Sequence, residues 1–168
     1  MKVEIAKYNL LWPALFAKEK EALQNIFSEE NFVIEHIGST SILGLGAKPV
    51  IDIMIGVSDF SLAKNFISGI ESLGYQYISR YESVMPFRKF FIKDYLGKRT
   101  HHIHLVELNT DFWKRHLAFR NYLRENDSVR DDYYLLKKRL AEREWNSGDE
   151  YAAAKSDFIN QVLNQALK

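Results

Sequence analysis

Residues 32–57 read FVIEHIGSTSILGLGAKPVIDIMIGV and contain two apolar runs joined by a loop that begins with small polar residues. The first run ends at the loop residues 38–41, GSTS, and Lys48 and Pro49 precede the second run. Both runs have the apolar, β-branched composition of strands, and glycine and proline interrupt the segment between them. The stretch therefore predicts a strand, a polar loop and a second strand.

The second apolar run carries a single carboxylate, Asp52. An acid in so apolar a strand costs free energy unless it is hydrogen-bonded, paired or bound to a metal ion. By strand alternation Asp52 shares a face with Met54, and Glu35 joins that face if residues 33–37 pair alongside. Two acids near a phosphate-binding loop would form a divalent-cation site. The alternative is a buried acid held by serine or threonine hydroxyls or by Lys48.

The loop between the two strands has the composition of an anion-binding turn. A short loop rich in glycine and serine after a strand can direct its backbone N–H groups at an anion. Gly38, Ser39 and Thr40 have this composition, and Lys48 adds a positive charge before the second strand. These residues therefore predict phosphate binding. The alternative is a turn whose hydroxyl groups cap nearby backbone.

Apolar spacing and capping residues predict helices on both sides of this unit. The expected helices span residues 13–28, 58–73, 110–123, 128–145 and 149–167. The expected further strands are residues 75–79 and a hairpin of residues 87–93 and 100–107 across a turn that contains Gly97. We therefore expect one domain of the α/β (α+β) class, with a mixed sheet flanked by helices in residues 1–108 and a helical part in residues 109–168.

Three histidines lie on the expected strand 100–107, and His102 and His104 share one of its faces. Histidines two apart on a strand can bind Zn²⁺, Mn²⁺ or Fe²⁺, or contact a phosphate when protonated. The alternative is a structural role with satisfied hydrogen bonds, which is common for a histidine in a strand.

Basic residues alternate with aromatic ones along the expected hairpin. Arg88 and Arg99 are the strongest phosphate candidates among them. Such a pattern is typical of surfaces that stack bases and hold phosphates, although a solvated hairpin face has the same composition. The C-terminal helices mix charges of both signs, which predicts an exposed surface over an aromatic core, without a chemical role.

Composition narrows the class of protein. The chain has 168 residues, of which 46% are hydrophobic and 27% charged, as in globular proteins. The formal net charge of +1 implies no overall attraction to nucleic acid or to a membrane. There is no cysteine, and the N-terminal residues lack the apolar core of a signal peptide. We therefore expect a cytoplasmic protein without a membrane partner.

The sequence resembles the GrpB-like family, which similarity places in the nucleotidyltransferase superfamily. The resemblance lies in EHIGSTS at residues 35–41, in Gly44 and Leu45, in AKP at 47–49 and in IDI at 51–53. It extends to RTHHIH at 99–104, FRNYLR at 119–124, LKKRLA at 136–141, and Tyr151 with Lys155. It implies a nucleotidyltransferase-like mixed sheet flanked by helices, a Gly-Ser loop that holds nucleotide phosphates, and acids that bind two metal ions.

The match to that superfamily pattern is incomplete. Gly38, Ser39 and Asp52 fit it, but Met54 stands where the second acid is expected, and a thioether is a poor ligand for Mg²⁺. Either Glu35 compensates, or one metal ion binds, or catalysis is lost. At the place of the third acid the chain offers His104, with Glu107 as an alternative on the opposite face of its strand.

The expectation is a metal-dependent, nucleotidyltransferase-like protein that binds a nucleoside triphosphate or another phosphorylated small molecule. Asp52 and Glu35 are the expected catalytic residues, and Asp52, His102 and His104 the expected ligands of Mg²⁺ or Mn²⁺, with Zn²⁺ as an alternative. The expected phosphate contacts are Gly38, Ser39, Thr40, Lys48, Arg88 and Arg99. The alternative functions are a non-catalytic nucleotide- or ligand-binding module and, with less support, nucleic-acid binding through the hairpin.

Overall fold

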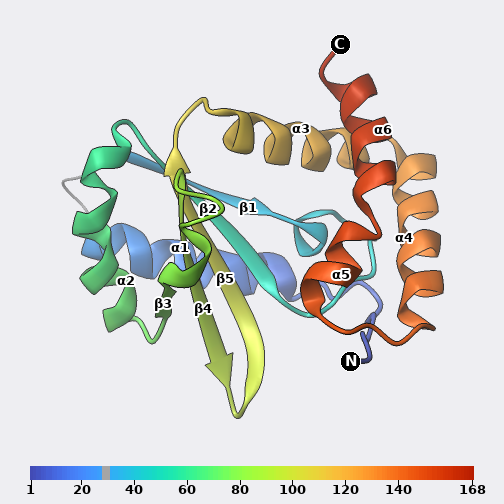
Figure 1. Cartoon of the computed structure of the whole chain (residues 1–168), viewed down its shortest axis with the longest axis horizontal. Coiled ribbons are helices and arrows are strands. Elements are labelled where there is room, and N and C mark those ends of the chain that lie inside the picture. Colours follow the sequence, from blue (N-terminus) through green and yellow to red (C-terminus); the bar gives the residue numbers. More distant parts are fainter. Residues whose placement is uncertain (28–30) are drawn as a thin grey trace.

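The structure is a computed structural model that describes residues 1–27 and 31–168. Its centre is a mixed five-stranded sheet with the order β1-β2-β5-β4-β3 (Figure 1). The strands are β1 (Phe32–Ile37), β2 (Ile51–Val57), β3 (Gln76–Ile78), β4 (Arg88–Tyr95) and β5 (Lys98–Glu107). β2 runs parallel to β5, whereas β1 pairs antiparallel with β2, and β4 pairs antiparallel with both β5 and β3.

The register of the central strands decides which side chains meet. Asp52 is paired with His102, and Met54 with His104, between β2 and β5. Glu35 of β1 is paired with Met54. Because directly paired residues project from the same side of a sheet, all five side chains belong to one face, which we call the site face.

The opposite face of the sheet is covered by α1 (Trp12–Ile26), the 3-10 helix η2 (Phe60–Phe66) and α2 (Ile67–Ser72). Its core includes side chains from each covering helix and from the sheet, such as Leu23, Phe66, Ile53 and Ile103, all 3% exposed or less. This continuous apolar layer fixes β2 and β5 in place. The site face is covered only in part, by α3 (Asp111–Glu125), whose Trp113 belongs to a buried cluster with Met54.

The helices α4 (Asp127–Ala141), α5 (Gly148–Ala153) and α6 (Ser156–Ala166) stand beside the sheet on the right of Figure 1. Of these, α4 and α6 pack on α3 and on the segment between β1 and β2. A buried cluster joins Ile42 and Leu45 of that segment to Leu123, Tyr133 and Val162 of α3, α4 and α6. Among the residues described, no helix is long and apolar enough to span a bilayer.

The predicted α/β (α+β) class, the mixed sheet flanked by helices and the hairpin are confirmed. Two helix ends differ from the prediction. The helix predicted to reach Trp145 ends at Ala141, because the backbone of Trp145 pairs instead with Met1, whose ammonium donates to the Trp145 carbonyl at 2.7 Å. The predicted last helix is divided into α5 and α6 at Ala154 and Lys155.

The predicted first helix ends at Ile26, and its last predicted residue, Ser28, lies outside the described residues. The predicted helix 58–73 begins with the 3-10 helix η2, which Asp59 caps as expected by accepting from the backbone of Ser61 at 2.9 Å. Two further short 3-10 helices are η1 (Ser39–Ser41), in the polar loop, and η3 (Ser79–Tyr81), before β4.

Candidate metal and phosphate site

The polar loop reaches the sheet at Gly38, which has φ 72° and ψ −178°, a conformation that favours glycine. A Cβ atom at this position would lie 2.5 Å from Oδ2 of Asp52. The Gly38 backbone is therefore in direct contact with the Asp52 carboxylate. The turn that follows is closed by Ser41, whose backbone N–H donates to the Gly38 carbonyl at 3.1 Å.

Thr40 points into the protein rather than toward the loop surface. Its side chain is 1% exposed, its hydroxyl donates to the Val50 carbonyl at 3.3 Å, and it lies 2.9 Å from Nε2 of His36. Because that hydroxyl has one proton, the His36 ring must donate through Nε2. The ring of His36 stacks on Phe16, with centroids 4.7 Å apart. Thr40 thus anchors the loop, whereas Ser39 is half-buried at its surface.

Cationic side chains of α3 and α4 hold the loop by its carbonyl groups. Arg124 donates twice to the Ser41 carbonyl, at 3.0 and 2.7 Å. The same kind of contact joins Arg120 to His36, Arg130 to Leu43 and Lys137 to Gly46. Burial lowers the pKa of Lys137 to about 7, with a further contribution from Lys155. The helical part, to which the sequence pattern assigned no chemistry, therefore fixes the loop conformation.

Asp52 and the two predicted histidines come together on the site face. Oδ1 of Asp52 lies 3.1 Å from Nδ1 of His102 and 3.5 Å from Nε2 of His104. One ligand atom from each residue falls within 4.8 Å of the others. Ligand atoms bound at about 2.0–2.2 Å to one zinc-like ion lie at most about 4.4 Å apart, so the group is close to the separations that such an ion requires. Within residues 1–27 and 31–168, this is the one such group of histidine, aspartate or glutamate side chains.

Each of these histidines lies between an arginine and Asp52. Nη1 of Arg99 is 3.1 Å from Nε2 of His102, and Nη1 of Arg88 is 3.2 Å from Nδ1 of His104. Because a guanidinium only donates and an ionised carboxylate only accepts, His102 carries its proton on Nδ1 and His104 on Nε2. Both rings are therefore neutral and bridge an arginine to the acid.

The electrostatics of the group suit metal binding. Burial alone would raise the pKa of Asp52, but the hydrogen bonds that it accepts from His102 and His104 outweigh burial and hold that pKa well below its usual range. Burial lowers the pKa of His104 to about 4, against the opposing effect of Asp52. Near neutral pH the site thus offers a carboxylate and a neutral imidazole, the forms that ligate metal ions.

The structure does not bring Glu35 into this group. Glu35 lies on the predicted face, but its Oε2 is 2.6 Å from Nη1 of Arg120. Met54 is fully buried in the cluster beneath α3 with Ile37 and Trp113. The place of the expected second acid is therefore filled by an apolar contact, and Glu35 is held away from it by an ion pair.

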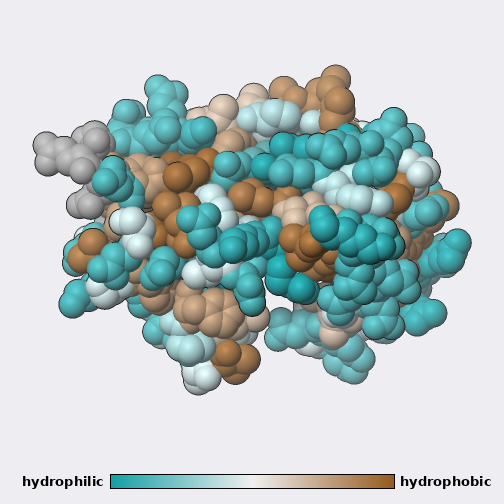
Figure 2. Space-filling view, turned by 90° about the horizontal axis from the view of Figure 1, so that it is seen from above, coloured by the Kyte–Doolittle hydropathy of each residue, from teal (hydrophilic) through white to brown (hydrophobic). Residues whose placement is uncertain are grey.

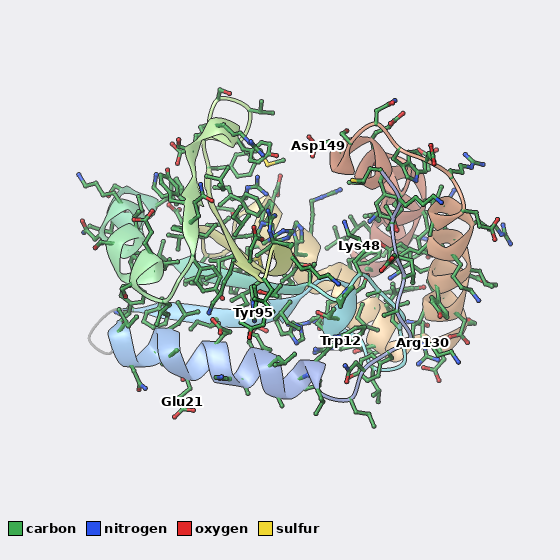
Figure 3. All side chains as sticks on the ribbon, turned by 90° about the horizontal axis from the view of Figure 1, so that it is seen from below. Trp12, Glu21, Lys48, Tyr95, Arg130 and Asp149 are labelled. Atoms are coloured by element: carbon green, nitrogen blue, oxygen red, sulfur yellow. The ribbon has the colours of Figure 1, made fainter. Side chains whose placement is uncertain are left out.

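Two lysines line the opposite side of the site from the hairpin. Lys48 is exposed, and its Nζ lies 5.9 Å from the ring centre of Tyr151, while Nζ of Lys155 lies 4.4 Å from the same ring. Burial, and then the charge of Lys48, lower the pKa of Lys155 to about 8, against the effect of Asp52. Figure 3 shows Lys48 beside an open space that separates the strands of the sheet from the C-terminal helices, and Figure 2 shows this hollow from the opposite side.

The loop-holding residues and Lys155 were not predicted to act at the site. One signal could have indicated them: Arg120 and Arg124 are four residues apart on a helix and so share one of its faces. A second is that the family resemblance extends to these arginines, to Lys137 and to Lys155. Sequence spacing alone could not show that they contact a loop more than eighty residues earlier.

Comparison with known proteins places this arrangement in a family. A family profile described as GrpB protein matches residues 2–165. The UPF0157 protein YqkA of Bacillus subtilis is 39% identical over 167 residues, covering 99% of this chain but 48% of that protein. The glutamate-rich protein GrpB of Alkalihalophilus pseudofirmus is 38% identical over 157 residues, covering 92% of this chain and 90% of that protein. The chain thus spans about half the length of the first relative and most of the second.

Comparison with solved structures identifies the same family and a related fold. The crystal structure of conserved protein GrpB from Enterococcus faecalis matches with a TM-score of 0.87 and 38% identity, over 98% of this chain and 97% of that one. The Cid1 poly(U) polymerase, in a structure with MgGTP bound, matches with a TM-score of 0.54 and 15% identity, over 83% of this chain and 45% of that one. This second likeness shows a nucleotidyltransferase-like fold.

Proposed function

This chain belongs to the GrpB family, and it brings Asp52, His102 and His104 together on a nucleotidyltransferase-like sheet. We propose that these three residues bind a divalent metal ion and that the phosphates of a nucleoside triphosphate bind next to that ion. The observation that carries the proposal is the convergence of the three ligand atoms within 4.8 Å beside the Gly38 backbone.

The donor set indicates the kind of ion. Two imidazole nitrogens and one carboxylate suit Mn²⁺, Fe²⁺ or Zn²⁺ better than Mg²⁺, which prefers oxygen ligands. Such an ion, when bound, would neutralise phosphate charge and polarise a phosphoryl group. We therefore favour Mn²⁺ or Zn²⁺ for this site and place Mg²⁺ behind them.

Metal loading has a consequence for the two arginines. If Nε2 of His104 gives its lone pair to a cation, the ring proton has to lie on Nδ1, where Arg88 now donates. The same argument applies to His102 and Arg99. Nη1 of Arg88 and Nη1 of Arg99 would then each lose the histidine acceptor and become free for a phosphate oxygen, while Arg99 would keep its ion pair with Asp94 through Nε. This agrees with the prediction that Arg88 and Arg99 contact phosphate, which stays a prediction.

The triphosphate would lie on the loop side of Asp52. Arg124 holds the loop just after Gly38 and Ser39, at the Ser41 carbonyl, so little ordering is needed when an anion binds. Lys48 and Lys155 supply positive charge across the hollow. Thr40 contributes by holding the loop, since its hydroxyl is occupied by internal hydrogen bonds.

A second candidate function is nucleotide binding without transfer. Met54 is buried in an apolar cluster and Glu35 is paired with Arg120, so the described residues provide one acid rather than a pair at the metal position. A mechanism that holds both the attacking and the leaving oxygen with two ions needs more ligands than this. Turnover assays with Mn²⁺ and each nucleoside triphosphate separate the two candidates.

Titration calorimetry tests the proposal, first with MnCl₂ alone and then with ATP in the presence of Mn²⁺. The wild-type chain should bind both, and Asp52→Asn should weaken Mn²⁺ binding at least about tenfold and abolish metal-dependent ATP binding. The matched control is Asp132→Asn, which removes an exposed acid of α4 and should change neither. Equal affinities for Asp52→Asn and the wild type would reject the site.

A further inference from the structure

Four aromatic rings lie beside the group formed by Asp52, His102 and His104, on the side away from the polar loop. They belong to Tyr81, Phe87, Phe90 and Phe112, and we call them the aromatic ledge. The ring centre of Phe90 lies 5.1 Å from that of His102 and 5.2 Å from that of His104. Because β5 separates β4 from β2, the ledge and the loop flank the site from opposite sides.

The aromatic ledge is accessible, whereas the aromatic ring on the opposite face of β4 is part of the core. The side chain of Phe87 is 46% exposed, whereas Phe91 is fully buried. The rings of Tyr81, Phe90 and Phe112 are half-buried. Neighbouring ring centres are 5.8 Å apart for Tyr81 and Phe90 and 6.2 Å apart for Phe87 and Phe112. Because Phe112 already stacks on His116, with centroids 4.0 Å apart, the ring most accessible to a flat partner is that of Phe87.

Arg88 lies among these rings without an acidic partner. Its guanidinium carbon is 4.7 Å from the ring centre of Phe90, 5.9 Å from that of Tyr81 and 6.0 Å from that of Phe112. Among the described residues it forms no ion pair, and its one side-chain hydrogen bond goes to His104. Its Nε is buried and has no hydrogen-bond partner in the part of the chain that the structure describes.

An unpartnered, buried donor on a cation is costly, and the natural partner for it is an anion. A guanidinium has five N–H donors, and within residues 1–27 and 31–168 only one of those of Arg88 has an acceptor. The exposed Arg80, 5.0 Å from the ring centre of Tyr81, adds a second positive charge at the outer edge of the ledge. A ligand that fits this place therefore combines a flat ring with a negative charge.

We propose that the ledge and Arg88 form a subsite for a nucleotide unit, whose base stacks on the rings and whose phosphate accepts from Arg88. Stacking on aromatic side chains and pairing with arginine are the two interactions by which proteins hold such a unit with little regard to sequence. The base and phosphate could come from a free mononucleotide or from the end of a single strand. That this unit is the acceptor of a transfer rests on the proposed function, whereas its binding does not.

Calorimetry in EDTA tests the subsite without the metal site. AMP should bind the wild-type chain, and ribose 5-phosphate, which lacks the base, should bind about tenfold more weakly. Phe87→Ala and Arg88→Met should each weaken AMP binding about tenfold or more. Tyr95→Ala, which removes a 70% exposed ring at the tip of the same hairpin, is the matched control and should leave binding unchanged.

The variants also separate this inference from the proposed function. Asp52→Asn should still bind AMP in EDTA, even where it no longer binds Mn²⁺. If AMP and a short oligoadenylate bind with equal affinity, the ligand is a free mononucleotide. If the oligoadenylate binds more tightly than AMP, the ligand is the end of a strand. Either result supports the subsite. Absence of AMP binding, or AMP binding that Phe87→Ala and Arg88→Met do not weaken, would overturn it.

Discussion

Replacing Gly38 with alanine should both destabilise the fold and disable the site. Gly38 has φ 72° and ψ −178°, a region that costs other residues about 1–3 kcal/mol. The added Cβ would lie 2.5 Å from Oδ2 of Asp52, so the carboxylate would have to move away from His102 and His104. A hydrogen bond to a charged group contributes about 1.5–3 kcal/mol. We expect a total loss of about 4 kcal/mol and a fall in Tm of about 10 °C.

Gly97→Ala is the matched control for backbone strain. Gly97 has φ 75°, but a Cβ there would have no neighbour within 4 Å. We expect this variant to lose about 1 kcal/mol, the usual cost of a left-handed conformation. The free energy of unfolding is measured by urea denaturation of both single variants. Combining Gly38→Ala with Asp52→Gly should remove the clash and leave only the strain.

The double variant gives a clear criterion. If the clash with the carboxylate is real, the cost of Gly38→Ala should be at least about 1 kcal/mol smaller in the Asp52→Gly background. Equal costs for Gly38→Ala and Gly97→Ala, or an unchanged cost in the Asp52→Gly background, would refute the contact between the loop and the acid on which the site depends.

Three further predictions concern the surroundings of the site. Burial lowers the pKa of His36 to about 4, so between about pH 6.5 and pH 4 the unfolded chain binds a proton that the folded chain does not. The free energy of unfolding should therefore fall as the pH drops through that range. In urea unfolding, His36→Gln should reduce the slope of this fall by an amount that corresponds to at most about one proton. Arg124→Met should cost about 2 kcal/mol in urea unfolding and weaken ATP binding, since the Ser41 carbonyl loses two charge-assisted bonds; unchanged ATP affinity would argue against a role for the loop. Met54→Asp should destabilise by several kcal/mol without adding a second Mn²⁺ in calorimetry, whereas Met54→Leu should cost less than about 1.5 kcal/mol.

The sheet could be predicted from sequence because its signals are local. The two apolar runs, the polar loop and the hairpin turn at Gly97 are each decided by residues within a few positions. Strand alternation then placed Asp52, His102 and His104 on faces that the observed register brings together. Alternation also placed Glu35 on the site face, but the face of a side chain does not show which residue it pairs with. The pairing with Arg120 depends on how α3 packs across β1.

The helical part shows what local patterns cannot provide. Charge patterning along α3 and α4 indicates a solvated surface, and Arg130 does pair with Asp127 and Asp131. Yet Arg124 and Lys137 donate to carbonyl groups of the loop between β1 and β2, a contact set by tertiary packing. The same limit explains the helix ends: a backbone pairing between Met1 and Trp145 spans almost the whole chain.

Diffraction from crystals grown with Mn²⁺ and a non-hydrolysable ATP analogue tests the central claim most directly. The account predicts an anomalous peak bonded to Asp52, His102 and His104, with the triphosphate against Gly38 and Ser39. A peak elsewhere, or an analogue bound without contact to Asp52 or the loop, would contradict it.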